Sequence, residues 1–157
     1  SDMIINDLII KILSNKKLSN RLIFDGYPRN ILQAQNLDKL LLKYNQKILC
    51  VLCLKVEKDI ILKRILGRQV CSKCGLIFNK FFNPANENNH KCKSQNLKTR
   101  SDDNENTVIN RLNTYAKETF PLINYYQKLN LLKEVDGSGE IEQIYKEIRY
   151  IIKSLGT

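Results

Sequence analysis

One almost uninterrupted apolar segment does most to restrict the fold of this chain. It runs from Ile48 to Val56, with the sequence ILCVLCLKV, and Lys55 is its charged exception. A strand that faces solvent on one side alternates apolar and polar residues, whereas a strand covered on both faces is apolar throughout. The segment therefore predicts a parallel strand in the interior of an α/β sheet.

Helical and strand-like segments alternate on both sides of this strand. Helical periodicity extends over residues 3–13, 31–42, 57–66, 106–129 and 140–155, and shorter apolar strands are expected over residues 22–25 and 131–135. Asn30 is placed to cap the second helix, and Pro121 to kink or interrupt the fourth. This order predicts an α/β fold with a parallel sheet.

The pattern stops at Gly67 and does not resume until about Asp103. Between them the sequence has no sustained periodicity and is rich in Cys, Gly, Pro and Asn. A structureless loop of this length is uncommon inside a compact domain. We therefore expect a separate subdomain over residues 67–104, inserted between the two parts of a core formed by residues 1–66 and 105–157.

This insert contains two pairs of metal-ligating residues. Cys71 and Cys74 are separated by two residues and followed by a glycine, and His90 and Cys92 form the second pair. Sulfur and imidazole ligands in two such pairs are typical of a tetrahedral structural zinc site. A partial or unoccupied site, with His90 an exposed histidine, is the alternative interpretation.

The other Cys-x-x-Cys pair, Cys50 and Cys53, is predicted to be part of the core. Residues three apart on a strand face opposite sides of the sheet, so these two thiols cannot share a metal ion. Five cysteines without a secretion signal favour thiols or metal ligands over disulfides.

The segment Leu22–Asn30, LIFDGYPRN, places polar groups directly after a predicted strand. Ligands bind at the carboxyl ends of parallel strands, so Asp25 is expected at that edge. A carboxylate there holds Mg²⁺ in phosphoryl-transfer sites. Gly26 permits the turn, Pro28 stiffens it, and the planar guanidinium of Arg29 suits phosphate oxygens.

Four segments resemble the adenylate kinase family, in order along essentially the whole chain. They are LIFDGYPRNILQAQ, ILKRILGR, TRSDDNENTVINRL and EVDGSGEIEQI. The resemblance implies a three-layer fold of the P-loop nucleoside monophosphate kinase type, with a mobile lid that carries zinc. His90 and Cys92 depart from the family pattern, because one residue separates them where two are usual.

The resemblance also implies roles for individual residues. AMP would be bound by Gly26, Arg29, Gln33, Arg100 and Arg111, with Gln33 reading the adenine edge. ATP would be bound by Arg64, Arg68, Gly137, Ser138 and Gly139. Catalysis would use Asp25, which organises Mg²⁺ and its waters, together with Arg68, Arg100 and Arg111. Asp102 and Asp103 would support these arginines and the lid hinge.

The phosphate-cradling pattern Gly-x-x-x-x-Gly-Lys does not occur in this sequence, since none of the six glycines precedes a lysine. In the family this loop follows the first strand, which lies in the middle of the sheet. We therefore expect a C-terminal portion of an adenylate kinase, inactive alone, that needs the missing N-terminal segment or another chain to complete the sheet.

The net charge of +10 raises a different hypothesis. A basic zinc-ribbon module could bind nucleic acid, but that interpretation leaves the DGYPR segment and the strand–helix alternation unexplained. A non-catalytic remnant of the kinase is a third hypothesis. The favoured interpretation expects ATP, AMP and ADP as partners, no nucleic acid and no membrane, and a cytoplasmic location.

Overall fold

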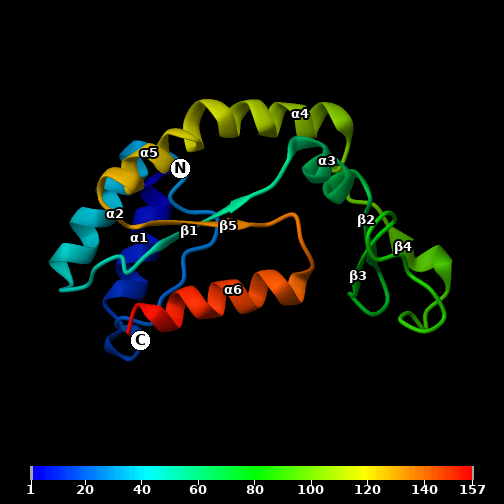
Figure 1. Cartoon of the computed structure of the whole chain (residues 1–157), viewed down its shortest axis with the longest axis horizontal. Coiled ribbons are helices and arrows are strands. Elements are labelled where there is room, and N and C mark those ends of the chain that lie inside the picture. The colour runs from blue at the N-terminus through cyan, green and yellow to red at the C-terminus, as the bar shows by residue number, and fades with distance from the viewer. Residues whose placement is uncertain (1, 157) are drawn as a thin grey trace. The chain divides into compact units, whose positions relative to one another are not determined.

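The computed structural model describes residues 2–156 and has the expected α/β class (Figure 1). Its longer helices are α1 (Asp2–Leu13), α2 (Ile31–Lys43), α3 (Lys58–Leu66), α4 (Glu105–Thr114), α5 (Pro121–Lys128) and α6 (Ile141–Ser154). Its strands are β1 (Val51–Lys55), β2 (Arg68–Cys71), β3 (Ile77–Asn79), β4 (Leu97–Lys98) and β5 (Leu132–Asp136). In this described part, no helix is both long and apolar enough to cross a bilayer.

Two compact units divide the chain. The first contains residues 1–54, 114–135 and 140–157, and the second contains residues 55–113 and 136–139. The second unit thus includes the predicted lid together with α3 and most of α4. The narrower lid boundaries at residues 67 and 104 stay a prediction.

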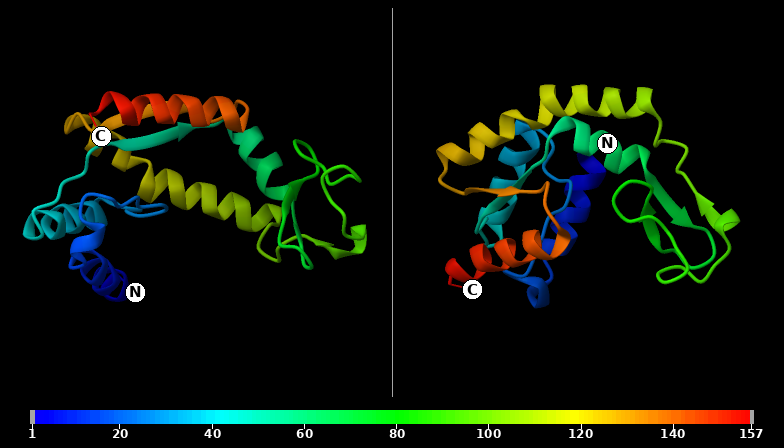
Figure 2. Two further views of the ribbon diagram at one scale, coloured as in Figure 1. Left: turned by 90° about the horizontal axis from the view of Figure 1, so that it is seen from below. Right: turned by 45° about the vertical axis from the view of Figure 1, so that its right-hand side comes forward.

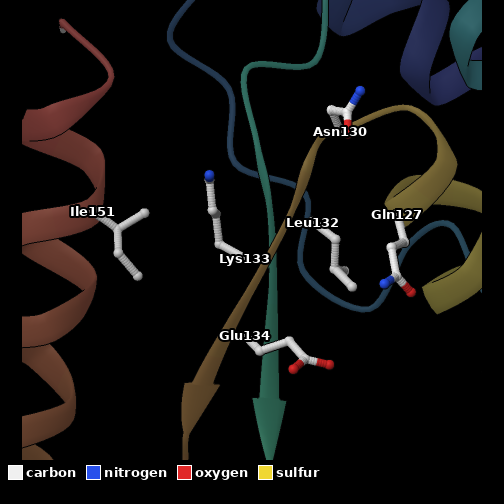
Figure 3. Close-up of a pocket in the computed structure, with 6 residues that line it drawn as sticks. All are labelled: Gln127, Asn130, Leu132, Lys133, Glu134 and Ile151. Atoms are coloured by element: carbon white, nitrogen blue, oxygen red, sulfur yellow. The ribbon is translucent and has the colours of Figure 1, made fainter.

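β1 and β5 form a two-stranded sheet, and both strands run in the same direction (Figure 3). The N–H of Val51 donates to the carbonyl of Leu131 at 2.8 Å at the start of this pair. The predicted parallel strand at residues 48–56 is therefore confirmed, over a shorter range. Among residues 2–156, no strand pairs with the other edge of β1.

The prediction of a strand over residues 22–25 is wrong. These residues belong to no strand in the structure, and the side chain of Ile23 is 92% exposed. A strand exists only as part of a hydrogen-bonded ladder, and the described part of the chain supplies this segment with no neighbouring strand. Its apolar sequence alone could not form one.

The core of the first unit is made where helices meet. Ile9 and Leu13 of α1 pack against Leu37 and Leu41 of α2, at the i, i+4 spacing that places residues on one helix face. Asn30 caps α2 as predicted, because its side chain accepts a hydrogen bond from the N–H of Gln33.

A second cluster joins α2 to α5 and to the parallel strands. Ala34, Leu122 and Tyr126 are its buried members, with Val51 and Leu132 among the side chains packed against them. The hydroxyl of Tyr125 donates to Asp38 at 2.6 Å, which adds a polar tie between the same two helices. α6 runs along the strand pair (Figures 1 and 2) and has no buried residue.

The helix predicted over residues 106–129 is divided into three parts. α4 ends at Thr114, Tyr115–Thr119 form a π-helical turn, and Pro121 begins α5. The predicted interruption at Pro121 is confirmed, since proline is well suited to the first turn of a helix. The π-helical turn was not predicted.

In the second unit, the insert forms an antiparallel sheet with the strand order β3-β2-β4. Arg68 pairs with Asn79 across β2 and β3, and Val70 with Lys98 across β2 and β4. Gly67 joins α3 to this sheet in a space where a Cβ atom would lie 2.7 Å from Asn79, Phe81 and the carbonyl of Lys63. The junction therefore accepts no side chain without movement of its neighbours.

Candidate functional site

The DGYPR loop holds Arg29 by its main chain and by its side chain. Gly26 has φ +69°, a conformation that favours glycine, and its carbonyl accepts a hydrogen bond from Arg29 Nε at 2.7 Å. The N–H of Arg29 donates to Gln33 Oε1 at 2.8 Å. Asp25, Gly26 and Arg29 are exposed, while Gln33 is buried. The structure thus brings together the residues predicted to bind AMP from this loop.

A further contact to Arg29 was not predicted. The hydroxyl of Thr119, the last residue of the π-helical turn, donates to the carbonyl of Arg29 at 2.9 Å. Thr119 lies outside every motif in the sequence, and threonines in helices are common. The two residues come into contact only because α5 packs on α2, which the sequence does not show.

Arg64 holds the turn that follows β5. Its Nη1 donates to the carbonyl of Gly137 at 2.6 Å and its Nη2 to that of Ser138 at 3.3 Å. Asp136 accepts a hydrogen bond from the N–H of Ser138, which lowers the pKa of the Asp136 carboxyl. The structure therefore joins Arg64 and the Gly137–Gly139 turn, both predicted to contact ATP.

Arg68 makes a two-pronged ion pair with Asp103. Nε donates to Oδ2 at 2.8 Å and Nη2 to Oδ1 at 2.5 Å. The Asp103 side chain is completely buried, whereas the Arg68 side chain is 27% exposed. The hydrogen bond to Asp103 raises the pKa of Arg68, and the pair fixes the plane of its guanidinium.

The neighbouring acid and arginine form a second pair. Arg111 donates to Asp102, and this hydrogen bond lowers the pKa of the Asp102 carboxyl. Arg100 is exposed, and its positive charge lowers the same pKa further. The structure thus gives Asp102 and Asp103 the contacts expected of residues that support arginines.

The four predicted metal ligands lie together in the insert. The ligand atoms of Cys71, Cys74, His90 and Cys92 are all within 4.8 Å of one another. Cys71 and His90 are buried, and the ring of His90 packs edge-on against Phe78 at 4.8 Å between centroids. His90 is therefore not the exposed histidine of the alternative interpretation.

Two observations show that this cluster fits a cation. His90 Nε2 is buried without a hydrogen-bond partner in the described chain, an arrangement that costs free energy unless something binds it. The thiols also influence one another: the pKa of Cys71 is lowered to about 6, whereas desolvation and hydrogen bonds to Cys74 and Cys71 raise the pKa of Cys92 to about 11. Three sulfurs and one imidazole are a ligand set typical of structural zinc.

Cys50 and Cys53 are half-buried thiols that lie outside this cluster. Desolvation raises the pKa of Cys50, against the opposing charge of Lys133. A raised pKa keeps a thiol protonated and unreactive. The predicted place in the core is met only in part, because both side chains are half-buried and neither belongs to the two core clusters.

An open pocket of about 480 Å³ lies in the first unit (Figure 3). Its lining residues come from the end of α5, from the turn that follows it, from β5 and from α6, and are Gln127, Asn130, Leu132, Lys133, Glu134 and Ile151. None of these residues was predicted to bind nucleotide. The candidate functional residues are instead the arginines described above with the groups that hold them, Arg29 in the first unit and Arg64, Arg68 and Arg111 in the second.

The fold and these groups define a class: an α/β protein with an inserted subdomain whose Cys/His cluster could hold a metal ion, and with arginines held by carbonyl and carboxylate groups. Comparison with known proteins gives the family. The family model for adenylate kinase matches residues 1–131. The chain is 46% identical to an adenylate kinase of Pelagibacter ubique (strain HTCC1062) over 153 residues, 98% of this chain and 72% of that protein.

Other bacterial relatives agree. The chain is 37% identical to an adenylate kinase of Nitrosococcus oceani over 156 residues, 98% of this chain and 72% of the relative. It is 42% identical to an adenylate kinase of Ruminiclostridium cellulolyticum over 146 residues, 92% of this chain and 66% of the relative. The chain belongs to the adenylate kinase family, and its insert makes it a member with a long lid.

Proposed function

We propose that this chain serves the adenylate kinase reaction, the reversible transfer of the γ-phosphoryl group of MgATP to AMP that yields two ADP. The observation that supports this most is the orientation of the predicted arginines by carbonyl or carboxylate groups. Arg29 is held by Gly26, Arg64 by the Gly137–Ser138 turn, and Arg68 by Asp103. Guanidinium groups fixed in this way can bind phosphate without a large loss of side-chain entropy.

In this proposal, the DGYPR loop binds AMP. Gly26 has no side chain that would cover the turn, and Arg29 presents its exposed guanidinium to the phosphate. Gln33, held next to Arg29 at the start of α2, reads the adenine edge through its carboxamide. Arg100 and Arg111, which belong to the second compact unit, are the further residues proposed to bind AMP.

The second compact unit binds ATP. Arg64 and the Gly137–Gly139 turn contact the adenine, and Arg68 contacts the phosphates. Arg68, Arg100 and Arg111 neutralise the charge that spreads over the transferring group, which is the main task of a protein in phosphoryl transfer. Mg²⁺, when bound with ATP, neutralises phosphate charge and orients the phosphate oxygens. Asp25 is the carboxylate proposed to hold it through water.

Zinc has a structural role here. Cys71, Cys74, His90 and Cys92 would hold it and so fix the fold of the insert. Four protein ligands would complete the usual coordination of zinc and leave no ligand position for substrate, which would separate this metal from the chemistry of transfer. Zinc thereby stabilises the lid that closes over the nucleotides.

We further propose that these 157 residues do not transfer phosphate alone. A glycine-rich phosphate loop is absent from the sequence, and β1 lacks a neighbour on one edge within the described residues. A segment that supplies the loop and a strand, in the same or another chain, would restore activity. No membrane or nucleic-acid partner is proposed, and the cytoplasmic location stays a prediction.

Calorimetry and a coupled kinase assay on the purified chain test the proposal. We expect AMP to bind without measurable turnover of ATP and AMP. Arg29→Ala should weaken AMP binding at least about tenfold, the loss expected when a charged hydrogen bond is removed. Arg21→Ala is the matched control, because Arg21 is an exposed arginine in the same unit outside the loop. Equal AMP affinity for Arg29→Ala and the unmodified chain would contradict the AMP site.

A further inference from the structure

The contact between Thr119 and Arg29 joins positions that are 90 residues apart. The threonine hydroxyl donates to the arginine carbonyl at 2.9 Å, and both residues belong to the same compact unit. Thr119 is half-buried, and the hydrogen bond itself is exposed to solvent. The contact involves the one residue of the DGYPR loop that is proposed to bind the AMP phosphate.

The π-helical turn places Thr119 at this position. The N–H of Phe120 donates to the carbonyl of Tyr115 at 2.8 Å, an i to i+5 bond that adds one residue to the helical turn. One residue corresponds to a rotation of about 100° around a helix axis. The direction of the Thr119 side chain therefore depends on this irregular turn, and such turns are frequent at functional sites.

Thr119 completes the fixation of the Arg29 main chain. The N–H of Arg29 is bound by Gln33 Oε1 at 2.8 Å, and its carbonyl is bound by Thr119. These two contacts hold the peptide groups on both sides of the Arg29 Cα atom. The position of the Arg29 Cα atom, from which the side chain extends, is thereby fixed. The hydrogen bond from Arg29 Nε to the carbonyl of Gly26 then fixes the orientation of the guanidinium.

The packing of α5 does not depend on this hydroxyl. Tyr125 donates to Asp38 at 2.6 Å, and the buried Ala34, Leu122 and Tyr126 join α5 to α2. Loss of the Thr119 hydroxyl should therefore change the loop and leave the helices in place. This separates a local effect on Arg29 from a general loss of stability.

We propose that Thr119 is a positioning residue for the binding of a nucleoside monophosphate, acting through the carbonyl of Arg29. This inference rests on the proposed function, because it takes Arg29 as the ligand of the monophosphate. Thr119 itself touches no substrate in this scheme. Its contribution is to hold the phosphate-binding arginine in place before the nucleotide arrives.

Three variants of the chain test the proposal by calorimetric titration with AMP and, separately, with ATP. Thr119→Val removes the donor and keeps the shape, and Thr119→Ser keeps the donor. Tyr125→Phe is the matched control, since it removes a hydrogen bond between α5 and α2 that does not involve Arg29. We expect Thr119→Val to weaken AMP binding about fivefold, within the range for one hydrogen bond. Its ATP affinity, and the AMP affinity of the other two variants, should stay within about twofold of the unmodified chain.

The carbonyl ¹³C chemical shift of Arg29 gives a second measurement that needs no nucleotide. It should move in Thr119→Val and return toward the original value in Thr119→Ser. Unchanged AMP affinity in Thr119→Val, equal losses for AMP and ATP, or failure of serine to restore binding would each overturn the inference alone. Absence of AMP binding by the unmodified chain would overturn the proposed AMP site, and this inference with it.

Discussion

The three-stranded sheet of the insert and the parallel pair β1–β5 are both small, but different interactions stabilise them. The insert pairs β2 with a strand on each edge and gathers four metal-ligating atoms within 4.8 Å. β1 pairs only with β5 in the described chain. Ile23, Leu54 and Ile141 in the same unit are 92%, 52% and 84% exposed. A metal site can stabilise a few short strands locally, whereas a parallel sheet depends on apolar surface supplied by distant segments.

Removal of zinc should have the largest effect and should be confined to the insert. Metal binding contributes roughly 10–16 kcal/mol to the folding of small zinc units. We expect chelation, or Cys71→Ser, to abolish amide protection over residues 67–104 while residues 31–43 keep theirs, as measured by hydrogen exchange and mass spectrometry. Cys50→Ser is the control that should retain one zinc per chain. Persistent protection of the insert after chelation would refute the comparison.

A cavity in the α1–α2 core should have a smaller effect in the other unit. Leu37 is 1% exposed and packs with Ile9, Leu13 and Leu41. Leu37→Ala should lower the free energy of unfolding by about 2–5 kcal/mol, followed by urea denaturation and circular dichroism. Zinc content should not change. Leu42→Ala, at a position 78% exposed, should have little effect, and similar losses in both variants would argue against this core.

A side chain at Gly67 should weaken the connection between α3 and the insert. A Cβ atom there would lie 2.7 Å from Asn79, Phe81 and the carbonyl of Lys63. Overpacking of this kind costs about 1–3 kcal/mol. We expect Gly67→Ala to lower the thermal midpoint of the insert without loss of zinc. An unaltered midpoint would mean that the junction is looser than the structure indicates.

The smallest effect concerns pH and the Asp102–Arg111 pair. Arg111 lowers the pKa of Asp102 in the folded chain, so the pair stabilises the fold above the ordinary pKa of a free carboxyl. That contribution should disappear as pH falls through the lowered value. Both side chains are about half exposed, which keeps the effect small. A carboxyl ¹³C titration should show it, and Asp102→Asn should remove it; an ordinary pKa for Asp102 would contradict the pairing.

Local patterns in the sequence predicted most of the fold. The spacing of Ile9 and Leu13, the Asn30 cap and the interruption at Pro121 depend on neighbouring residues, so they could be identified without knowing the tertiary structure. The strand expected over residues 22–25 depends on a partner strand. Its apolar sequence showed that it could pair with a neighbouring strand, but the described chain contains no strand beside it.

The candidate site divides in the same way. The four metal ligands come from short motifs, and the structure brings them together although one residue, not two, separates His90 from Cys92. The hydrogen bond from Thr119 to Arg29 has no sequence signature, because it requires both a π-helical turn and the docking of α5 on α2. Contacts of this kind become visible only in three dimensions.

In the proposed ATP site, the ion pair of Arg68 with Asp103 decides which N–H groups of the guanidinium remain for a triphosphate. Asp103 occupies Nε and one N–H of Nη2, on the edge of the guanidinium that faces the interior. A guanidinium has five N–H groups, so the outward edge retains donors for phosphate oxygens. The carboxylate therefore need not be displaced when nucleotide enters. It keeps the Arg68 guanidinium in one orientation, so an incoming phosphate would meet an arginine that is already held in place.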